Sequence, residues 1–473
     1  MKNKYTYLSK NIILFSVSGF VPKFLALILV PIYTSCLSTA EYGVSDLITT
    51  TVSLLIPIFT LDIQDAVMRF ALDKEYKKDD VFSTAVKIMM TGFFIICMGA
   101  FVVSKLELSG IKDSYILFFI LMYFTSAAHN IVSLFCRGID KVNVMTVSSI
   151  LNSVITLTAN ILFLVVFKWG LNGYLLANTV GSFAALICCF FGAGLYRYVK
   201  WSVPKIVVKN MIIFSAPLII SVIAWWVNGA FDRYILTWIS GVAVSGLYAA
   251  AYKIPNLLSV FQNIFAQAWS ISAIKEFDKN DSDGFIGNMY TMMNFAMSVI
   301  CSGIMIVNIP VSKILFSNNF FEAWKYVPPL LISVVFNAMS LFIGSIFTAV
   351  KDTKTLSVST VTGAAVNIVC NFILIYFYGA YGAAVATLLG YAVTLVMRHV
   401  ILRKHIRLNC KQRRDIAVYL VLLIQMIIAE FGVTAIAIQL IPFAVILLFY
   451  KNEILNVYNW IMEKINNNLN KQK

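Results

Sequence analysis

The chain is a succession of long apolar runs separated by short polar segments. A helix needs about 20 apolar residues to cross a hydrocarbon core of about 30 Å. By this measure the pattern predicts membrane-spanning helices near residues 11–37, 44–68, 82–103, 114–135, 142–167, 174–195, 210–230, 242–271, 285–309, 326–349, 357–377, 382–402, 415–430 and 433–450. The run from Ile416 to Phe449 is too long for one crossing, so we expect a turn at Ala429–Gly432. The predicted fold is an all-α integral membrane protein with about fourteen spans.

The composition agrees with a membrane protein. Hydrophobic residues make up 60% of the chain and charged residues 12%, whereas soluble domains contain about 25% charged residues. The basic N-terminal segment is similar to the start of a signal peptide. Its apolar run is too long for one, however, and no A-x-A site follows, so we expect it to remain as the first transmembrane helix.

The sequence offers no sign of an enzyme. Its predicted loops are too short to hold a soluble catalytic domain, and it contains no Walker A, HExxH or GxSxG motif. The eight cysteines form no CxxC pair, and most lie in apolar runs, where they are expected to pack as small apolar residues. We therefore predict that the protein is not an enzyme and has no metal or other cofactor.

The net charge of +15 is distributed among the loops. Most Lys and Arg residues fall in alternate predicted loops, as the positive-inside rule describes for cytoplasmic segments. With an even number of spans, this pattern places both termini in the cytoplasm. We expect no nucleic-acid partner, and we interpret the basic segment 398–414 as an orientation signal that contacts anionic membrane lipids.

Two segments, which begin at Val147 and Val358, resemble each other as helix, Gly-x-x-Gly turn and helix. Their alignment pairs Ser148 with Ser359, Asn160 with Asn371, Gly170 with Gly379, Gly173 with Gly382 and Ala177 with Ala386. A weaker similarity relates the segments that begin at Asn11 and Asn210. The offset of six spans indicates a parallel repeat, which places a substrate site between the copies. We predict six-helix lobes at 1–205 and 206–408, a central cavity, and two extra helices in 409–473.

Two lysines lie deep inside predicted spans, where a charge costs about 2.5–3.5 kcal/mol on insertion scales. Lys23 follows Pro22, and Lys253 precedes Pro255 by two residues, so each predicted lobe has a lysine beside a helix-bending proline. Two cations that face one cavity favour an anionic ligand. The alternative is that each lysine pairs with a carboxylate and only supports the structure.

Acidic and basic residues also occur near the predicted ends of the second helix. Asp62, Asp65 and Arg69 are spaced i, i+3, i+7, which predicts one shared helical face. They form either an ion pair at the membrane edge or a site for gating or cation coupling, and Arg69 is also a candidate substrate contact. Asp46, near the opposite end of this helix, is a further candidate for coupling or gating.

Asp232 and Arg233 lie where the seventh predicted helix leaves the membrane. Asp232 is a candidate for coupling or gating, and Arg233 for substrate binding. The alternative is that they anchor the helix at the interface, because Trp225, Trp226 and Tyr234 lie nearby and aromatic residues gather at that depth.

Four segments resemble a known family. They are "LVPIYTSCLSTAEYGVSDL" and "DIQDAVMRFAL" near the second predicted helix, "FDRYILTWISGVAVSGLYAAAYKIPNLL" across the seventh and eighth, and "YGAYGAAVATLLGY" across the eleventh and twelfth. The chain is similar to Wzx-type flippases for O-antigen and other polysaccharide repeat units, within the multidrug/oligosaccharidyl-lipid/polysaccharide exporter superfamily. The similarity extends over nearly the whole chain.

The resemblance implies a two-lobed core of twelve helices with two more helices. It implies translocation of an undecaprenyl-diphosphate-linked oligosaccharide between the leaflets of a bacterial inner membrane, by alternating access coupled to an ion gradient. A diphosphate suits Lys23 and Lys253, and a sugar chain suits the amides of Asn160 and Asn371. Such asparagines equally well hold helices together. Polysaccharide polymerase machinery is a further expected partner.

Other functions stay open on the sequence. A lipid II flippase differs only in its headgroup, and a multidrug exporter of the same superfamily favours acidic and aromatic residues in its cavity. A membrane-embedded glycosyltransferase or ligase requires sizeable periplasmic loops with catalytic residues, and a sugar polymerase typically has one large periplasmic loop. The short predicted loops disfavour both of these classes.

Overall fold

The computed structural model describes residues 24–105, 113–275, 277–282, 284–350, 352–406, 410–455, 459 and 462. All regular elements in these ranges are helical, as predicted. Among the described residues, ten helical segments are long and apolar enough to cross a membrane, and shorter apolar helices occupy Phe24–Cys36 and Val242–Ala251. The all-α multi-pass class is thus confirmed, while the count of fourteen spans stays a prediction.

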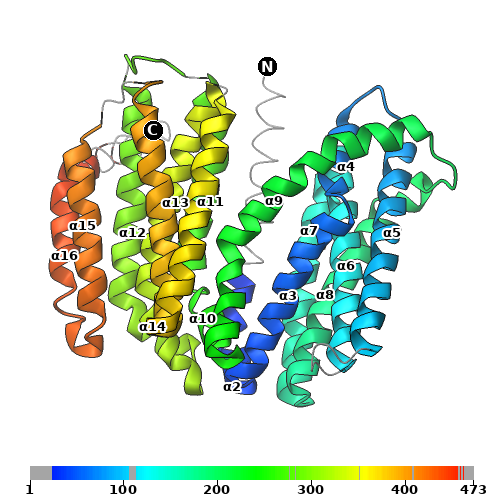
Figure 1. Cartoon of the computed structure of the whole chain (residues 1–473), viewed down its shortest axis with the longest axis horizontal. Helices are drawn as coiled ribbons and strands as arrows, with labels where there is room; N and C mark the ends of the chain where they lie inside the picture. Colours follow the sequence, from blue (N-terminus) through cyan, green and yellow to red (C-terminus); the bar gives the residue numbers. More distant parts are fainter. Residues whose placement is uncertain are drawn as a thin grey trace, which may run out of the picture. The chain divides into compact units, whose positions relative to one another are not determined.

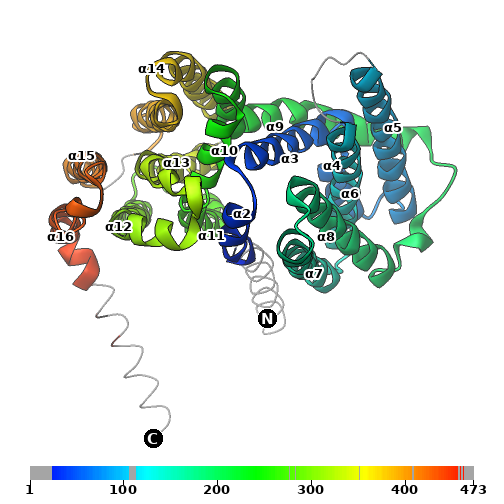
Figure 2. The same ribbon diagram turned by 90° about the horizontal axis from the view of Figure 1, so that it is seen from below.

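The described residues form two compact units. The first comprises the chain up to Thr237 with Gly241–Ala249 and Leu315–Phe320. Its elements are α2 (Val30–Cys36), α3 (Thr39–Phe59), α4 (Ile63–Leu72), α5 (Lys78–Lys105), α6 (Asp113–Gly138), α7 (Val142–Asn160), a π-helical turn (Ile161–Val166), α8 (Gly170–Gly192), a 3-10 turn (Leu195–Tyr198) and most of α9 (Lys205–Ser240) and α10 (Val242–Ala251). Within it α6 packs against α4, α5 and α8, and α7 packs against α8 (Figure 1; Figure 2).

The second unit comprises Trp238–Ser240, Ala250–Ile314 and the chain from Phe321 onward. Its elements are α11 (Pro255–Lys275), α12 (Phe285–Leu315), a 3-10 helix (Asn318–Tyr326), α13 (Val327–Ala349), α14 (Thr353–Leu402), α15 (Gln412–Ala429), a 3-10 turn (Gly432–Ala435) and α16 (Leu440–Phe449). Helix α13 lies at its centre, where it packs against α11, α14 and α15, and most of its side chains are buried.

Helix α14 is a hairpin of two packed arms. Its backbone leaves the helical conformation at Gly379, which has φ of +54°. The arms approach closely, because a Cβ atom on Gly363 would lie 1.9 Å from Oγ1 of Thr394. At the base, Asp352 caps the first arm through the backbone N–H of Thr355 at 3.0 Å and lies 3.0 Å from Nε2 of His405 beyond the second arm. The two predicted helices 357–377 and 382–402 correspond to these arms.

The two aligned segments have the same local geometry at their turns. Gly170 and Gly379 are both left-handed, with φ of +56° and +54°, a conformation that glycine adopts without steric cost. Gly173 and Gly382 each approach the backbone of the preceding helix closely. These contacts support the predicted repeat of helix, glycine turn and helix.

Two helices that the pattern predicts as continuous are interrupted, and these predictions are wrong in that detail. The predicted helix 44–68 ends at Phe59 and resumes at Ile63, because Leu61 and Asp62 are left-handed, with φ of +53° and +48°. The predicted helix 242–271 breaks before Pro255, which lacks a backbone N–H and clashes with the preceding turn. Lys253 therefore lies in a break between α10 and α11 rather than inside a helix.

Candidate functional site

Helices α3 and α10 touch backbone to backbone at two glycines. A Cβ atom on Gly43 would lie 2.2 Å from the carbonyl oxygen of Val242, and one on Gly246 would lie 2.0 Å from that of Thr39. Real side chains do not tolerate such distances, so both positions require glycine. The two glycines bring α3 and α10 close together, and polar side chains of α3, α9 and α10 meet about one turn further along.

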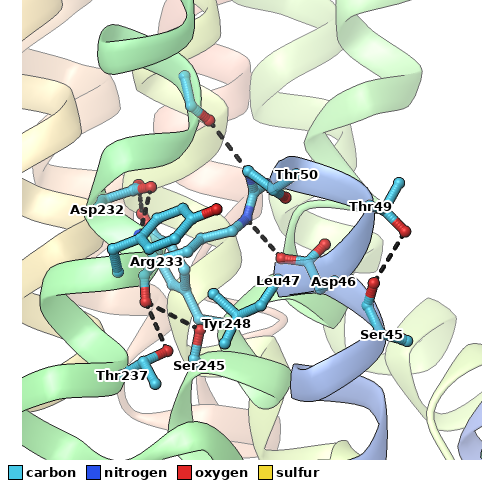
Figure 3. Close-up of polar contacts among 12 residues, drawn as sticks. Ser45, Asp46, Leu47, Thr49, Thr50, Asp232, Arg233, Thr237, Ser245 and Tyr248 are labelled. Carbon is cyan, nitrogen blue, oxygen red and sulfur yellow. Dashed lines mark hydrogen bonds and ion pairs between the residues drawn. The ribbon is translucent and has the colours of Figure 1, made fainter. Parts of the chain in front are cut away.

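An ion pair joins α3 to α9 at this point. Nε of Arg233 lies 3.0 Å from Oδ2 of Asp46, and the two side chains are 14% and 22% exposed. Figure 3 shows Arg233 reaching from α9 toward Asp46 on α3. Nη1 of Arg233 also donates to the carbonyl of Gly229, 3.3 Å away. Because water is largely excluded from the pair, it is stronger than a pair on an open surface.

Asp232 is the most deeply buried acid of this group, at 2% exposed. Its Oδ2 accepts a hydrogen bond of 2.7 Å from the hydroxyl of Tyr248 on α10, and its Oδ1 accepts one of 2.9 Å from the backbone N–H of Arg233 (Figure 3). A buried carboxylate is costly unless its oxygens have donors. Tyr248, itself fully buried, supplies one of those donors and ties α10 to α9.

Two further hydrogen bonds connect α3 and α9. The indole N–H of Trp226 donates to the carbonyl of Thr50 at 3.0 Å, and the hydroxyls of Tyr234 and Thr51 lie 2.6 Å apart. Asp46, Thr50 and Thr51 on α3 all contact α9, so together they mark the side of α3 that meets α9. We call Asp46, Asp232, Arg233 and Tyr248 the ion-pair cluster.

The ion-pair cluster joins three helices through groups whose attraction depends on charge and on distance. A separation of a few ångströms, or a change in the charge of one carboxylate, weakens the connection sharply. Such a contact can hold the three helices together in one conformation and let them separate in another. Within the described residues no three His, Cys, Asp or Glu side chains are placed to hold a metal ion.

The prediction that Asp62, Asp65 and Arg69 share one helical face is wrong. Asp62 precedes α4 in a left-handed conformation and is fully buried, whereas Asp65 and Arg69 on α4 are exposed. Gln64 donates to Oδ1 of Asp62 at 3.1 Å. Arg69 pairs instead with Asp73 one turn later, at 3.6 Å. The break before α4 rotates Asp62 away from the other two residues.

Four predicted residues remain, namely Lys23, Lys253, Asn160 and Asn371. Lys23 lies outside the described residues, and Lys253 belongs to the second unit, half-buried. Asn160 and Asn371 are fully buried at aligned positions. Asn160 donates to the carbonyl of Thr156 at 2.7 Å, and Asn371 donates to Oδ1 of Asn367 at 3.0 Å. Both asparagines thus lie within helix packing.

Asp46, Asp232 and Arg233 were predicted from the sequence as separate candidates, and Tyr248 was not predicted. Gly43 lies three residues before Asp46, and Gly246 lies two residues before Tyr248. Small residues permit close helix packing in membranes. A glycine a few residues from an intramembrane polar residue was therefore the sequence signal that could have predicted this contact.

Comparisons with known proteins agree with this architecture. A family model described as polysaccharide biosynthesis protein matches residues 8–271. A probable low-salt glycan biosynthesis flippase of Haloferax volcanii is 24% identical over 242 residues. That match covers 48% of this chain and 51% of the relative, so the chain spans about half the length of the curated relative that it matches.

Solved structures share the fold over most of the chain. The lipid II flippase MurJ in an inward closed conformation has a TM-score of 0.71 at 14% identity, and the match covers 93% of this chain and all of that one. An inward-facing multidrug resistance transporter of the MATE family, within the MOP superfamily, has a TM-score of 0.66 at 14% identity, with 85% and 98% covered. At these identities the likeness establishes the fold.

Proposed function

Because the chain belongs to the polysaccharide biosynthesis protein family, we propose that it is a flippase for lipid-linked oligosaccharides. The observation that carries this proposal is the family match over residues 8–271 on a chain with the MurJ-like fold. The substrate is an undecaprenyl-diphosphate-linked repeat unit, moved from the cytoplasmic to the periplasmic leaflet of a bacterial inner membrane. Both termini lie in the cytoplasm, and polysaccharide polymerase machinery receives the product.

The ion-pair cluster acts as a gate in this proposal. Alternating access requires helices that separate in one state and meet in the other. Helices α3 and α10 meet at Gly43 and Gly246 without intervening side chains. The Asp46–Arg233 pair joins α3 to α9 one turn further along α3. With the Asp46–Arg233 contact made, the proposed gate is closed.

Asp232 is the candidate for coupling to an ion gradient. It is an acid of low exposure beside a cation and a hydroxyl donor, so binding a proton or cation there weakens the attraction to its neighbours. Release of Tyr248 then loosens α10 from α9. Asp62, also fully buried, is a second candidate, and Asp65 is less suited because it is exposed.

Lysines and arginines are the proposed contacts for the diphosphate. Lys253 lies in the break between α10 and α11, two residues before Pro255, and Lys23 follows Pro22 in the sequence. Arg69, more than half exposed, is a candidate contact at the membrane edge. Phosphate oxygens form strong charge-assisted hydrogen bonds with such groups.

Two related functions compete with this one. The MurJ likeness favours a lipid II flippase, and the MATE likeness favours a multidrug exporter. Purified protein in liposomes distinguishes them with three probes: a fluorescent undecaprenyl-diphosphate oligosaccharide, fluorescent lipid II and a cationic dye. We expect protein-dependent exchange of the oligosaccharide lipid alone. Exchange of lipid II alone, or dye export alone, contradicts the proposal in favour of the corresponding alternative.

A further inference from the structure

The second unit contains a cavity of about 250 Å³ that is unrelated to the ion-pair cluster. It lies where the second arm of α14 meets α15, with Tyr290 of α12 and Phe336 of α13 among its lining residues. One part of the lining is apolar, and another part carries Arg403 and Gln412, at the connection between α14 and α15. The cavity is therefore amphipathic along its length.

The apolar part of the cavity faces outward. Val396 and Val400 on α14 and Ile416 on α15 are 61%, 58% and 59% exposed. In a multi-pass membrane protein, side chains of this kind contact lipid chains. Deeper in, the hydroxyl of Tyr419 donates to Asn294 at 3.0 Å, and its ring packs edge-on against Phe336 at 5.1 Å. The Tyr419 hydroxyl is satisfied by Asn294, so what Tyr419 and Phe336 offer to the cavity is the apolar surface of their rings.

The cation at the mouth has no carboxylate partner in the described part of the chain. Nη2 of Arg403 donates to the neutral amide oxygen of Gln412 at 2.8 Å, and no acid forms an ion pair with it. Asp415, the acid in the lining, is buried and pairs with Arg414, 3.3 Å away.

Arg414 also contacts Glu453, so its charge is already shared between two carboxylates. Three more exposed cations flank Arg403 and Gln412 in the sequence, namely Lys404, Lys411 and Arg413. The mouth of the cavity is thus positively charged.

We propose that this cavity binds one anionic phospholipid. Its phosphate lies at Arg403 and Gln412, and part of one acyl chain lies against Val396, Val400 and Ile416. Basic pockets between transmembrane helices are known to suit anionic headgroups. The volume is slightly below the 300–1,000 Å³ usual for ligand sites, so the cavity holds a chain segment while the rest of the lipid stays in the bilayer.

The occupant is a resident lipid rather than the transported one. All lining residues lie within the second unit, so the cavity does not require a particular placement of the first unit. A site that is complete within one unit suits a lipid that stabilises α14 and α15. This inference is independent of the proposed flippase function.

Native mass spectrometry of the purified protein tests the site, with phosphatidylglycerol and phosphatidylcholine of identical acyl chains as probes. Arg403→Gln removes the charge in the lining, and Lys404→Gln removes the same charge from the adjacent exposed residue that does not line the cavity. We expect one phosphatidylglycerol retained in preference to phosphatidylcholine. Arg403→Gln lowers that retention about fivefold, since one basic residue near a membrane surface contributes about 1 kcal/mol, and Lys404→Gln changes it less than twofold.

A second variant, Val396→Trp, keeps every charge and fills the apolar part, and we expect it to lower phosphatidylglycerol retention as well. Melting temperatures without added lipid identify any variant that is misfolded. Equal retention of the two lipids overturns the proposal, as does equal loss in Arg403→Gln and Lys404→Gln, which indicates diffuse attraction to the basic segment. Displacement of phosphatidylglycerol by one equivalent of undecaprenyl phosphate assigns the cavity to the prenyl lipid instead and also overturns it.

Discussion

Breaking the Asp46–Arg233 pair is predicted to open the contact between α3 and α9. Asp46→Asn and Arg233→Gln each remove one charge while keeping a side chain of similar shape. The double variant removes both charges and leaves no unpaired ion. The matched control is Arg69→Gln, which breaks the exposed Arg69–Asp73 pair in the same unit.

The expected magnitude follows from the distance and the exposure of the pair. At 3.0 Å the Coulomb attraction is about 5.5 kcal/mol for an effective dielectric constant of about 20, before the cost of desolvation. Breaking a buried pair costs about 3–5 kcal/mol, and an exposed pair contributes about 0–1 kcal/mol. With side chains 22% and 14% exposed, Asp46 and Arg233 lie between these limits. We expect each single variant to destabilise the joined state of α3 and α9 by about 2 kcal/mol. We expect a coupling energy of about 1–2 kcal/mol between the two substitutions.

Spin labels at Ser53 on α3 and Ile220 on α9 report the separation of the two helices. Both positions are exposed, and the eight native cysteines are first replaced. A cost of about 2 kcal/mol shifts the ratio of separated to joined populations about thirtyfold. We expect each single variant to shift the distance distribution toward longer values, the double variant to shift it by less than the sum of the two, and Arg69→Gln to leave it unchanged.

The gate interpretation is refuted if both single variants keep the wild-type distances while the protein remains folded. It is equally refuted by a coupling energy below about 0.5 kcal/mol, because residues that act independently are additive within that range.

Three more variants test the packing around this site and the base of α14. Gly246→Ala should impair export and lower the melting temperature, since its Cβ would lie 2.0 Å from a carbonyl oxygen, whereas Gly99→Ala, with nothing within 4 Å, should be neutral or stabilise α5 by up to about 1 kcal/mol. Tyr248→Phe removes a donor from a buried carboxylate and should destabilise the protein by about 1.5–3 kcal/mol, measured by thermal unfolding in detergent. Asp352→Ala should lower the melting temperature at neutral pH, because the side-chain hydroxyl of Thr355 holds the pKa of Asp352 below its usual value. The stabilisation by ionised Asp352 is fully present above the unfolded pKa of about 3.9 and is lost as pH falls through the lower folded pKa. The difference in melting temperature between Asp352→Ala and wild type should therefore vanish below the folded pKa.

Each of these variants has an outcome that contradicts its reasoning. If Gly246→Ala and Gly99→Ala change export and melting temperature equally, the close backbone contact at Gly246 is not what makes glycine necessary there. Unchanged unfolding of Tyr248→Phe means that the carboxylate has enough donors without it. A difference between Asp352→Ala and wild type that does not shrink as pH falls below the unfolded pKa of about 3.9 contradicts a role for the ionised carboxylate.

The sequence predicts the helices well because membrane spans depend on local hydrophobicity, and Gly379 and its aligned partner Gly170 mark the turns between them. The break at Leu61 and Asp62 carries no such signal. Its cause is a pair of left-handed residues that are not glycine, and the hydrophobic pattern continues through it. The break before Pro255 was readable, because proline at that position interrupts the preceding turn.

The pairing of Asp46 with Arg233 was not readable from the sequence. Each residue appeared as a separate candidate near the end of a different helix, with 186 residues between them. Which residues meet depends on how α3 and α9 slide and rotate against each other. The contacts at Gly43 and Gly246 fix α3 against α10, and the Tyr248–Asp232 hydrogen bond ties α10 to α9. These contacts depend on three-dimensional packing rather than on local composition.

The most direct test of the central claim is a leaflet-resolved measurement of lipid-linked repeat units in cells depleted of this protein. Spheroplasts labelled with an impermeant sugar-oxidising reagent report the units in the periplasmic leaflet, and total lipid extraction reports all units. The account predicts that repeat units accumulate while the periplasmic fraction falls, and that wild-type protein restores the distribution. Repeat units that still reach the periplasmic leaflet at the normal rate, in cells from which other flippases have also been deleted, would contradict it.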